Sequence, residues 1–195
     1  MSSPKQVTAG DILPMSEYVK IRDTKRKQVV EMKRNRRLEV GPHVSFYFEN
    51  WDTMWLQIQE MLYIEKGGHE QLVDELAAYN PLIPNGRELV ATVMFEIDDP
   101  NIRKRILGQL GGVEETIYLT IGSDKIMAEA ETDVDRTTAE GKTSSVHFIH
   151  FRLTPNQVAA FKSETAITIG FEHPDYGHST RLPLAVRDAL AQDFD

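Results

Sequence analysis

The chain has 195 residues, of which 41% are hydrophobic and 27% are charged, and its formal net charge is −8 at pH 7. This length and composition predict one globular domain with a sizeable hydrophobic core. The chain contains no cysteine, which excludes disulfides, thiolate nucleophiles and metal centres held by cysteine. It also lacks an apolar run of membrane-spanning length and the apolar region of a signal peptide, so we expect a soluble, cytoplasmic protein.

The basic residues are concentrated in one segment near the N-terminus. Residues 20–37 contain nine lysines and arginines and two acidic residues, a net charge of +7 that leaves −15 for the rest of the chain. Nucleic acid would be attracted by this segment and repelled by the remainder of the molecule. Binding of nucleic acid through residues 20–37 is therefore one hypothesis, and the overall charge disfavours it.

The first predicted helix runs from about residue 15 to residue 34, after a polar stretch, residues 1–11, that we expect to be loose. Its inward stripe includes Arg22 and Arg26, which is unusual for a simple packing face. The aliphatic parts of both side chains can pack while the guanidinium groups pair with distant carboxylates. We expect Glu49 and Glu65 to be those carboxylates. The alternative is a basic helix that binds phosphate.

The central stretch, residues 44–66, predicts a short strand that leads directly into a helix. Apolar and polar residues alternate up to Phe48, which is the period of a strand with two different faces. Asn50 can cap the helix that follows, and that helix is apolar on nearly every side, so we expect it to contact protein all round. Glu65 lies within its apolar stripe. It is either paired, protonated or metal-bound there, or the last turn already emerges into water.

The remainder of the chain predicts one more N-terminal helix and then a region rich in strands. A helix is expected at residues 69–79, followed by a loop. Alternating apolar residues then predict five strands, at residues 89–97, 114–121, 124–131, 144–153 and 165–171. Further helices are expected at residues 98–110, 154–163 and 184–191, and residues 132–142 are predicted to form an exposed loop.

These elements predict an α+β fold in which N-terminal helices pack on a mainly antiparallel sheet of five to six strands. The turn at residues 122–124 favours an antiparallel hairpin between two of the strands. The whole chain, residues 1–195, is expected to be a single domain, with a mainly helical part at 12–80 and a sheet-rich part at 86–195.

Three stretches of the sequence resemble one known family: ILPMSEYVKIR, RRLEVGPHVSFYFENWDTMWLQIQEM and FEHPDY. It is the bacterial family of domains of unknown function numbered 3501, and the similarity extends over essentially the whole chain. The family carries no assigned activity, so what the resemblance implies is context. Its genes commonly lie beside rubrerythrin-like and iron–sulfur oxidoreductase-like genes, which implies an accessory role in redox or peroxide metabolism. Its most specific motif corresponds here to Glu49, Asn50, Thr53, Gln57 and Glu60.

The histidines offer two places for a metal or a polar site. His147 and His150 lie three apart on a predicted strand, so they point to opposite faces and cannot bind one ion without a bulge. His173 and His178 flank a Pro-Asp-Tyr-Gly loop, in which Asp175 and Tyr176 could complete a small polar constellation. The alternative is an exposed turn with solvated histidines, because a metal needs three or four converging ligands.

Recognised catalytic motifs are missing from the sequence. It contains no H-E-x-x-H helix, no Glu-x-x-His pair, no dinucleotide or P-loop glycine pattern and no Gly-x-Ser-x-Gly elbow. No cofactor is detectable, although a bound metal is possible. The absence of motifs weakens the enzyme hypothesis without removing it, because acid–base sites assemble from distant residues.

Three functional hypotheses follow. We favour a non-catalytic accessory or interaction protein of a redox or peroxide-stress system, with a rubrerythrin-like or iron–sulfur oxidoreductase-like partner. The second is an enzyme or sensor that binds a metal or small anion. Its candidate ligands are Glu49, Glu60, Glu65, His173 and His178. In that case Arg22, Arg26, Glu49 and Glu65 would form a polar pocket for the ligand rather than an ion-pair network. The third is the nucleic-acid binder described above.

Overall fold

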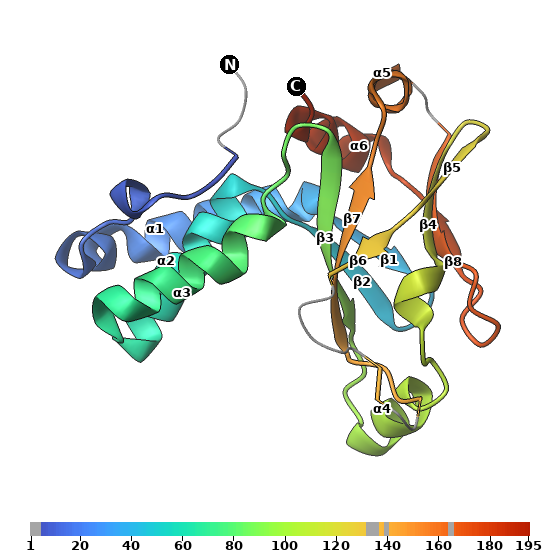
Figure 1. Cartoon of the computed structure of the whole chain (residues 1–195), viewed down its shortest axis with the longest axis horizontal. Helices are drawn as coiled ribbons and strands as arrows, with labels where there is room; N and C mark the ends of the chain where they lie inside the picture. Colours follow the sequence, from blue (N-terminus) through green and yellow to red (C-terminus); the bar gives the residue numbers. More distant parts are fainter. Residues whose placement is uncertain (1–4, 132–136, 139–140, 164–165) are drawn as a thin grey trace.

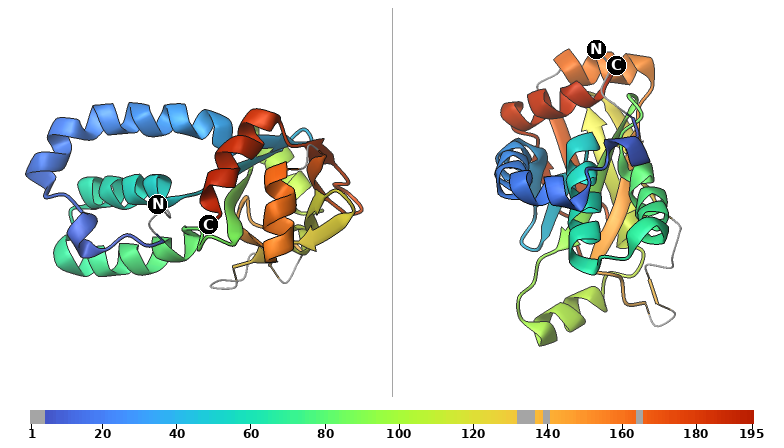
Figure 2. Two further views of the ribbon diagram at one scale, coloured as in Figure 1. Left: turned by 90° about the horizontal axis from the view of Figure 1, so that it is seen from above. Right: turned by 90° about the vertical axis from the view of Figure 1, so that its left-hand side faces the viewer.

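The computed structural model of the chain describes residues 5–131, 137–138, 141–163 and 166–195. Its N-terminal part is a bundle of three helices: α1 (Met15–Lys33), α2 (Trp51–Glu65) and α3 (Gly68–Tyr79). The helices lie side by side and extend away from the strands, which they meet at one end of the bundle (Figure 2). That end is set by the chain itself, because α1 leads into the first strand, α2 follows the second and α3 leads into the third.

The strands form two antiparallel sheets. The larger has the order β1-β2-β3-β7-β6, and the smaller has the order β5-β4-β8-β9. The strands of the larger sheet are β1 (Arg37–Val40), β2 (Val44–Phe48), β3 (Glu88–Phe95), β7 (Val146–Arg152) and β6 (Glu129–Ala130). Those of the smaller sheet are β5 (Asp124–Met127), β4 (Ile117–Ile121), β8 (Ile167–Phe171) and β9 (Ser179–Arg181). The α+β class is confirmed, and the five-stranded sheet is the one that the helix bundle contacts.

The two sheets face one another and enclose the main hydrophobic core. Every second residue of a strand points into this core. Examples are Phe46 on β2, Val93 on β3 and Leu119 on β4, all of which are fully buried. The sheets also meet along their edges, since β5 continues into β6 across Ala128 and β1 contacts β9. The predicted hairpin is β4–β5, with Ile121 paired to Asp124.

A second apolar cluster joins the helix bundle to the outer face of the larger sheet. It combines α2 side chains such as Met54 and Ile58 with Val90, which points outward from β3. Because Val90 alternates with Ala91 in the main core, one strand contributes to both clusters. The helix bundle therefore covers part of the outer face of the five-stranded sheet, whereas Arg37 and Glu39 on β1 stay exposed.

Three shorter helices complete the fold: α4 (Pro100–Leu107), α5 (Pro155–Ser163) and α6 (Leu184–Leu190). α5 and α6 lie at one end of the paired sheets and α4 lies at the other (Figure 1). Within the described ranges, no helix is both long and apolar enough to cross a membrane.

The N-terminal segment is held more firmly than its polar sequence predicts. In the part that the structure describes, Val7 is buried, and its backbone exchanges two hydrogen bonds with the Asn80 side chain at 2.7 and 2.9 Å. The indoles of Trp51 and Trp55 donate to the carbonyl oxygens of Gln6 and Asp11. Residues 5–11 therefore pack on the bundle. Their polar backbone, rather than their side-chain composition, makes these contacts.

Candidate functional site

A cavity of about 310 Å³ lies where the foot of the helix bundle meets the outer face of the larger sheet. The sheet side is formed by outward-pointing residues of three adjacent strands: Tyr47 on β2, Thr92 and Met94 on β3, and Phe148 on β7. The helical side is formed by the end of α1, the first turns of α2, and the segment in which α3 ends. Its lining residues are Lys33, Met54, Gln57, Tyr79 and Leu82.

Glu49 is the acidic residue of this cavity, and it is only 5% exposed. It follows β2 directly and continues the sheet, since its backbone N–H donates to the Val90 carbonyl at 2.8 Å. Its Oε1 accepts a hydrogen bond from the Thr92 hydroxyl at 2.7 Å. Its Oε2 is buried and has no hydrogen-bond partner among the described residues. One half of the carboxylate is thus held in place while the other half is unsatisfied.

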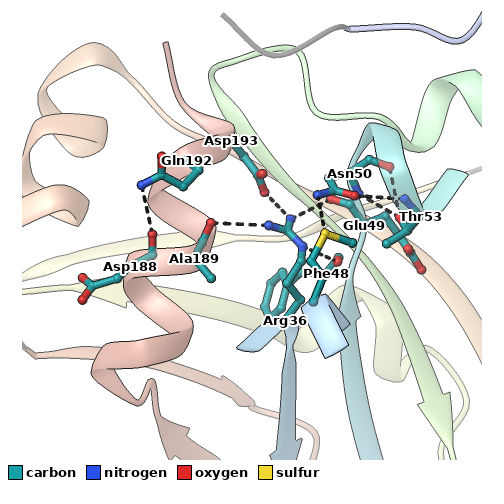
Figure 3. A network of polar contacts seen from close by, with 10 residues as sticks. Arg36, Phe48, Glu49, Asn50, Thr53, Asp188, Ala189, Gln192 and Asp193 are labelled. Carbon is teal, nitrogen blue, oxygen red and sulfur yellow. Dashed lines mark hydrogen bonds and ion pairs between the residues drawn. The ribbon is translucent and has the colours of Figure 1, made fainter. Parts of the chain in front are cut away.

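The backbone around Glu49 is fixed on both sides. On one side, Asn50 caps α2: its side chain accepts from the Thr53 N–H at 3.0 Å, and the Thr53 hydroxyl accepts from the Asn50 N–H at 2.9 Å. On the other side, the buried Arg36 guanidinium donates to the carbonyls of Phe48 and Glu49, both at 3.0 Å (Figure 3). The backbone position of Glu49 is therefore determined by a helix cap and an arginine.

Arg36 also connects this junction to the C-terminal end of the chain. Its guanidinium forms an ion pair with Asp193 at 2.5 Å and donates to the Ala189 carbonyl of α6 at 3.4 Å (Figure 3). Burial raises the pKa of Asp193, and the arginine opposes that rise. A second cavity, of about 350 Å³, lies against this pair and Asn50. The arginine already has four acceptors, so we interpret this cluster as a structural junction.

The other polar groups of the Glu49 cavity offer hydrogen bonds rather than reactive groups. The Gln57 amide nitrogen donates to the Tyr79 hydroxyl at 3.3 Å, which leaves the amide oxygen as an acceptor. Burial raises the pKa of Tyr47, and a 2.6 Å hydrogen bond from its hydroxyl to Glu96 adds to that rise. In the described part of the chain, no group of three or more His, Asp or Glu side chains could hold a metal ion. The arrangement is suited to binding a small organic molecule.

The arginine network differs from the predicted one in its acidic partner. Arg22 forms a two-point ion pair with Glu60, with both N–O distances at 2.7 Å, and Arg26 approaches the same carboxylate at 3.9 Å. Glu49 and Glu65 were the wrong partners. Successive helix positions turn by about 100°, which places Glu60 toward α1 and Glu65 elsewhere. Glu65 instead accepts a hydrogen bond from Gln71 at the exposed end of α2.

The predicted loop constellation has a packing role around Tyr176. Its hydroxyl donates to the Val40 carbonyl at 2.8 Å, and the same hydroxyl accepts a hydrogen bond from the His43 N–H at 3.1 Å. The His178 ring packs against Tyr176, with a centroid distance of 4.6 Å. His173 accepts from the Asp175 N–H at 3.2 Å, and Asp175 is exposed. These contacts fix the loop to the β1–β2 hairpin.

His147 and His150 lie on opposite faces of β7, as the strand period predicts. His147 packs against Phe95 inside the paired sheets. His150 lies outside them between two carboxylates, with Glu88 3.1 Å from Nδ1 and Glu131 2.7 Å from Nε2. Burial alone would lower the pKa of His150, but these two carboxylates outweigh it and raise the pKa.

Eight residues of the candidate cavity were missed by sequence reasoning: Lys33, Tyr47, Met54, Tyr79, Leu82, Thr92, Met94 and Phe148. The strand period could have placed Tyr47 and Thr92 on the face opposite the core. Nothing in the sequence states that the end of α1 and the end of α3 lie beside those strands. Of the residues that were predicted, the cavity brings Glu49 and Gln57 together, and Asn50 and Thr53 hold them from the helix cap.

The two facing antiparallel sheets, with a helix bundle on the outer face of one of them, define an α+β protein with a pocket between bundle and sheet. Residues 6–194 match the family described as "Protein of unknown function (DUF3501)", and the chain belongs to this family, which confirms the resemblance. It is similar to a solved structure of a "novel protein of unknown function" from Burkholderia pseudomallei K96243. The two are 33% identical with a TM-score of 0.90, over 97% of this chain and 100% of that one. No curated protein matches.

Proposed function

We propose that this protein binds a small organic molecule in the cavity between its helix bundle and its five-stranded sheet. The observation that carries the proposal is the Glu49 carboxylate, which is 5% exposed and has one buried oxygen without a partner among the described residues. A bound molecule that donates a hydrogen bond would satisfy it. The role is binding, and the chain would act as a carrier or a sensor.

An unsatisfied buried acceptor is costly, which is why native proteins contain few of them. Burying a polar group without a partner costs about 1–3 kcal/mol, and more when the group is charged. Thr92 relieves this cost for Oε1 only. A cost that the fold retains in a residue that lines a cavity has a direct explanation if a ligand removes it. The cavity volume of about 310 Å³ is also at the lower end of ligand pockets, roughly 300–1,000 Å³.

The proposal is tested by protein-observed NMR with the full-length chain and a library of small fragments that are cationic, neutral and anionic. We expect some fragments to shift the amide signals of Glu49, Gln57, Thr92 and Met94 together. Met94→Trp should abolish those shifts, because the larger side chain fills the cavity. Met127→Trp is the matched control, since Met127 is 43% exposed on the edge strand β5. Fragments that perturb only other surfaces, or whose effect survives Met94→Trp, would overturn the proposal.

The accessory role in a redox or peroxide-stress system stays a prediction. It is supported by the gene context that the family resemblance implies, and a binding protein is compatible with it. Co-purification of a rubrerythrin-like or iron–sulfur partner from native extract tests it, and repeated recovery of neither class would contradict it.

A further inference from the structure

We propose that the ligand of the Glu49 cavity is a small primary amine, bound as its ammonium ion, with an apolar body of about ten non-hydrogen atoms. This inference rests on the proposed function and adds the chemical class of the ligand. It follows from three features of the cavity: the unsatisfied oxygen, the apolar walls and the single lysine at the end of α1.

The unsatisfied oxygen selects for a donor. A carboxylate accepts hydrogen bonds and does not donate them, whereas an ammonium group has three donors and no acceptor. The Glu49 Oε2 can take one donor, and the Gln57 amide oxygen and the Tyr79 hydroxyl are further acceptors among the lining residues. An ammonium ion also supplies the charge that a buried carboxylate needs. An anionic ligand would place a second negative charge beside the first.

The remaining walls select for an apolar body of limited size. Met54, Leu82, Met94 and Phe148 line the cavity, and the two methionines can adjust to different ligand shapes. A volume of about 310 Å³ holds on the order of ten non-hydrogen atoms at roughly 30 Å³ each, the share of one water in the liquid. Most peptides are larger than this and polyamines carry charges along their length, whereas an arylalkylamine has both the size and the apolar body.

Lys33 distinguishes two kinds of ligand that carry an ammonium group: simple amines and amino acids. It lines the same cavity, and no ion pair is found for it in the described part of the structure. A simple amine would leave this lysine unpaired. An amino acid with an apolar side chain would place its ammonium at Glu49 and its carboxylate at Lys33. Both share the ammonium and the apolar body, and they differ in their dependence on Lys33.

The ligand class is tested by isothermal titration of the wild-type chain with three probes of nearly equal size: 2-phenylethylamine, 2-phenylethanol and phenylacetate. We expect the amine to bind about tenfold to a hundredfold more tightly than the alcohol, the range for a hydrogen bond to a charged group. Phenylacetate should bind more weakly still. Equal affinities, or tighter binding of phenylacetate, would overturn the amine assignment.

A matched pair of variants assigns the selectivity to one side chain. Glu49→Gln keeps the size of the residue and removes its charge, so it should abolish the preference for the amine over the alcohol. Glu65→Gln makes the same change at the last residue of α2, outside the cavity, and should retain the preference. Thermal unfolding checks that both variants fold. If Glu49→Gln fails to fold, the order of the three probes on the wild-type chain still decides the question.

The last comparison distinguishes the two sources and separates this inference from the proposed function. Lys33→Gln should weaken binding of L-phenylalanine while leaving 2-phenylethylamine unchanged if the ligand is an amino acid. Tighter binding of 2-phenylethylamine than L-phenylalanine in both proteins assigns a simple amine. If a neutral or anionic molecule binds more tightly than the amines, and Met94→Trp abolishes its binding, the amine class is refuted while the binding function stands.

Discussion

At the scale of single residues, two arginines of this protein, one buried and one partly exposed, form ion pairs with carboxylates that are distant in sequence. Arg22 pairs with Glu60 and Arg36 pairs with Asp193. Chemistry requires that such guanidinium groups be paired, so the need for a partner is predictable from their place in an apolar stripe. Which carboxylate serves depends on helix phase and on the path of the chain, and both are set by the packed structure.

The Arg22–Glu60 pair can be tested by a double-mutant cycle with Arg22→Met and Glu60→Gln. We expect the double variant to lose less stability than the sum of the single losses, because both substitutions remove one shared interaction. The same cycle between Arg22 and Glu65 should be additive. Urea denaturation measures each free energy of unfolding. Additive losses for Arg22 and Glu60 would contradict the pair.

The same pair predicts the acid side of the stability curve. The Arg22 guanidinium lowers the pKa of Glu60, so the folded state holds that carboxylate ionised more strongly than the unfolded chain does. Its contribution is present above the ordinary glutamate pKa and is lost as the pH falls through the lowered value. Glu60→Gln should therefore flatten the loss of stability below about pH 4.5.

At the scale of elements, His150 ties three strands of the larger sheet together. It projects from β7 and contacts Glu88 at the start of β3 and Glu131 just after β6. The short strand β6 pairs with β7 through only two residue pairs, so this side-chain link supports a weak edge. A histidine held between two carboxylates makes that edge sensitive to pH.

The predicted consequence is a loss of stability as the pH rises. The raised pKa of His150 means that the folded state binds this proton more tightly than the unfolded chain does. The stabilisation is fully present below about pH 6.5, the ordinary histidine value, and is lost as the pH rises through the folded-state value. Urea denaturation from pH 5.5 to 8.5 should show this slope in the wild-type chain. His150→Gln should remove it and Glu131→Gln should reduce it; an unchanged slope in His150→Gln would refute the assignment.

At the scale of the whole molecule, three parts of the chain meet at Arg36. The guanidinium, which is 3% exposed, contacts the end of β2, the link between β2 and α2, and the C-terminal part of the chain at Ala189 and Asp193. The helix bundle, the paired sheets and the C-terminus are therefore connected through one side chain, and the backbone of Glu49 is part of that connection.

We expect Arg36→Met to destabilise the protein by roughly 3–5 kcal/mol, because it leaves Asp193 buried without its counter-charge. Arg36→Lys should also be costly, since an ammonium group cannot reach four acceptors in one plane. Arg34→Met is the control. Arg34 is 70% exposed, so its loss should change stability by about 0.5 kcal/mol or less. Chemical denaturation compares the three, and equal effects of Arg36→Met and Arg34→Met would contradict the junction.

Much of the fold was predictable because local periods reflect burial. The alternation along residues 89–97 and the continuous apolar character of α2 identified elements that the structure contains. The short strands β1 and β9 were missed, because three or four residues are too few to show a period. The division of the strands into two facing sheets was also missed, since pairing between strands distant in sequence leaves no local signal.

For the candidate site, the sequence by itself determined that Glu49 follows a strand and precedes a capped helix, and the family resemblance placed it in one motif with Gln57. Those features depend on neighbouring residues and on the preferences of the backbone. Only the tertiary structure decided that Thr92 satisfies one oxygen of Glu49, that the other is left without a partner, and that Lys33 and Tyr79 close a cavity around it. The physical reason is that a pocket is the space between packed elements, and that space is fixed only when helices and sheet come together.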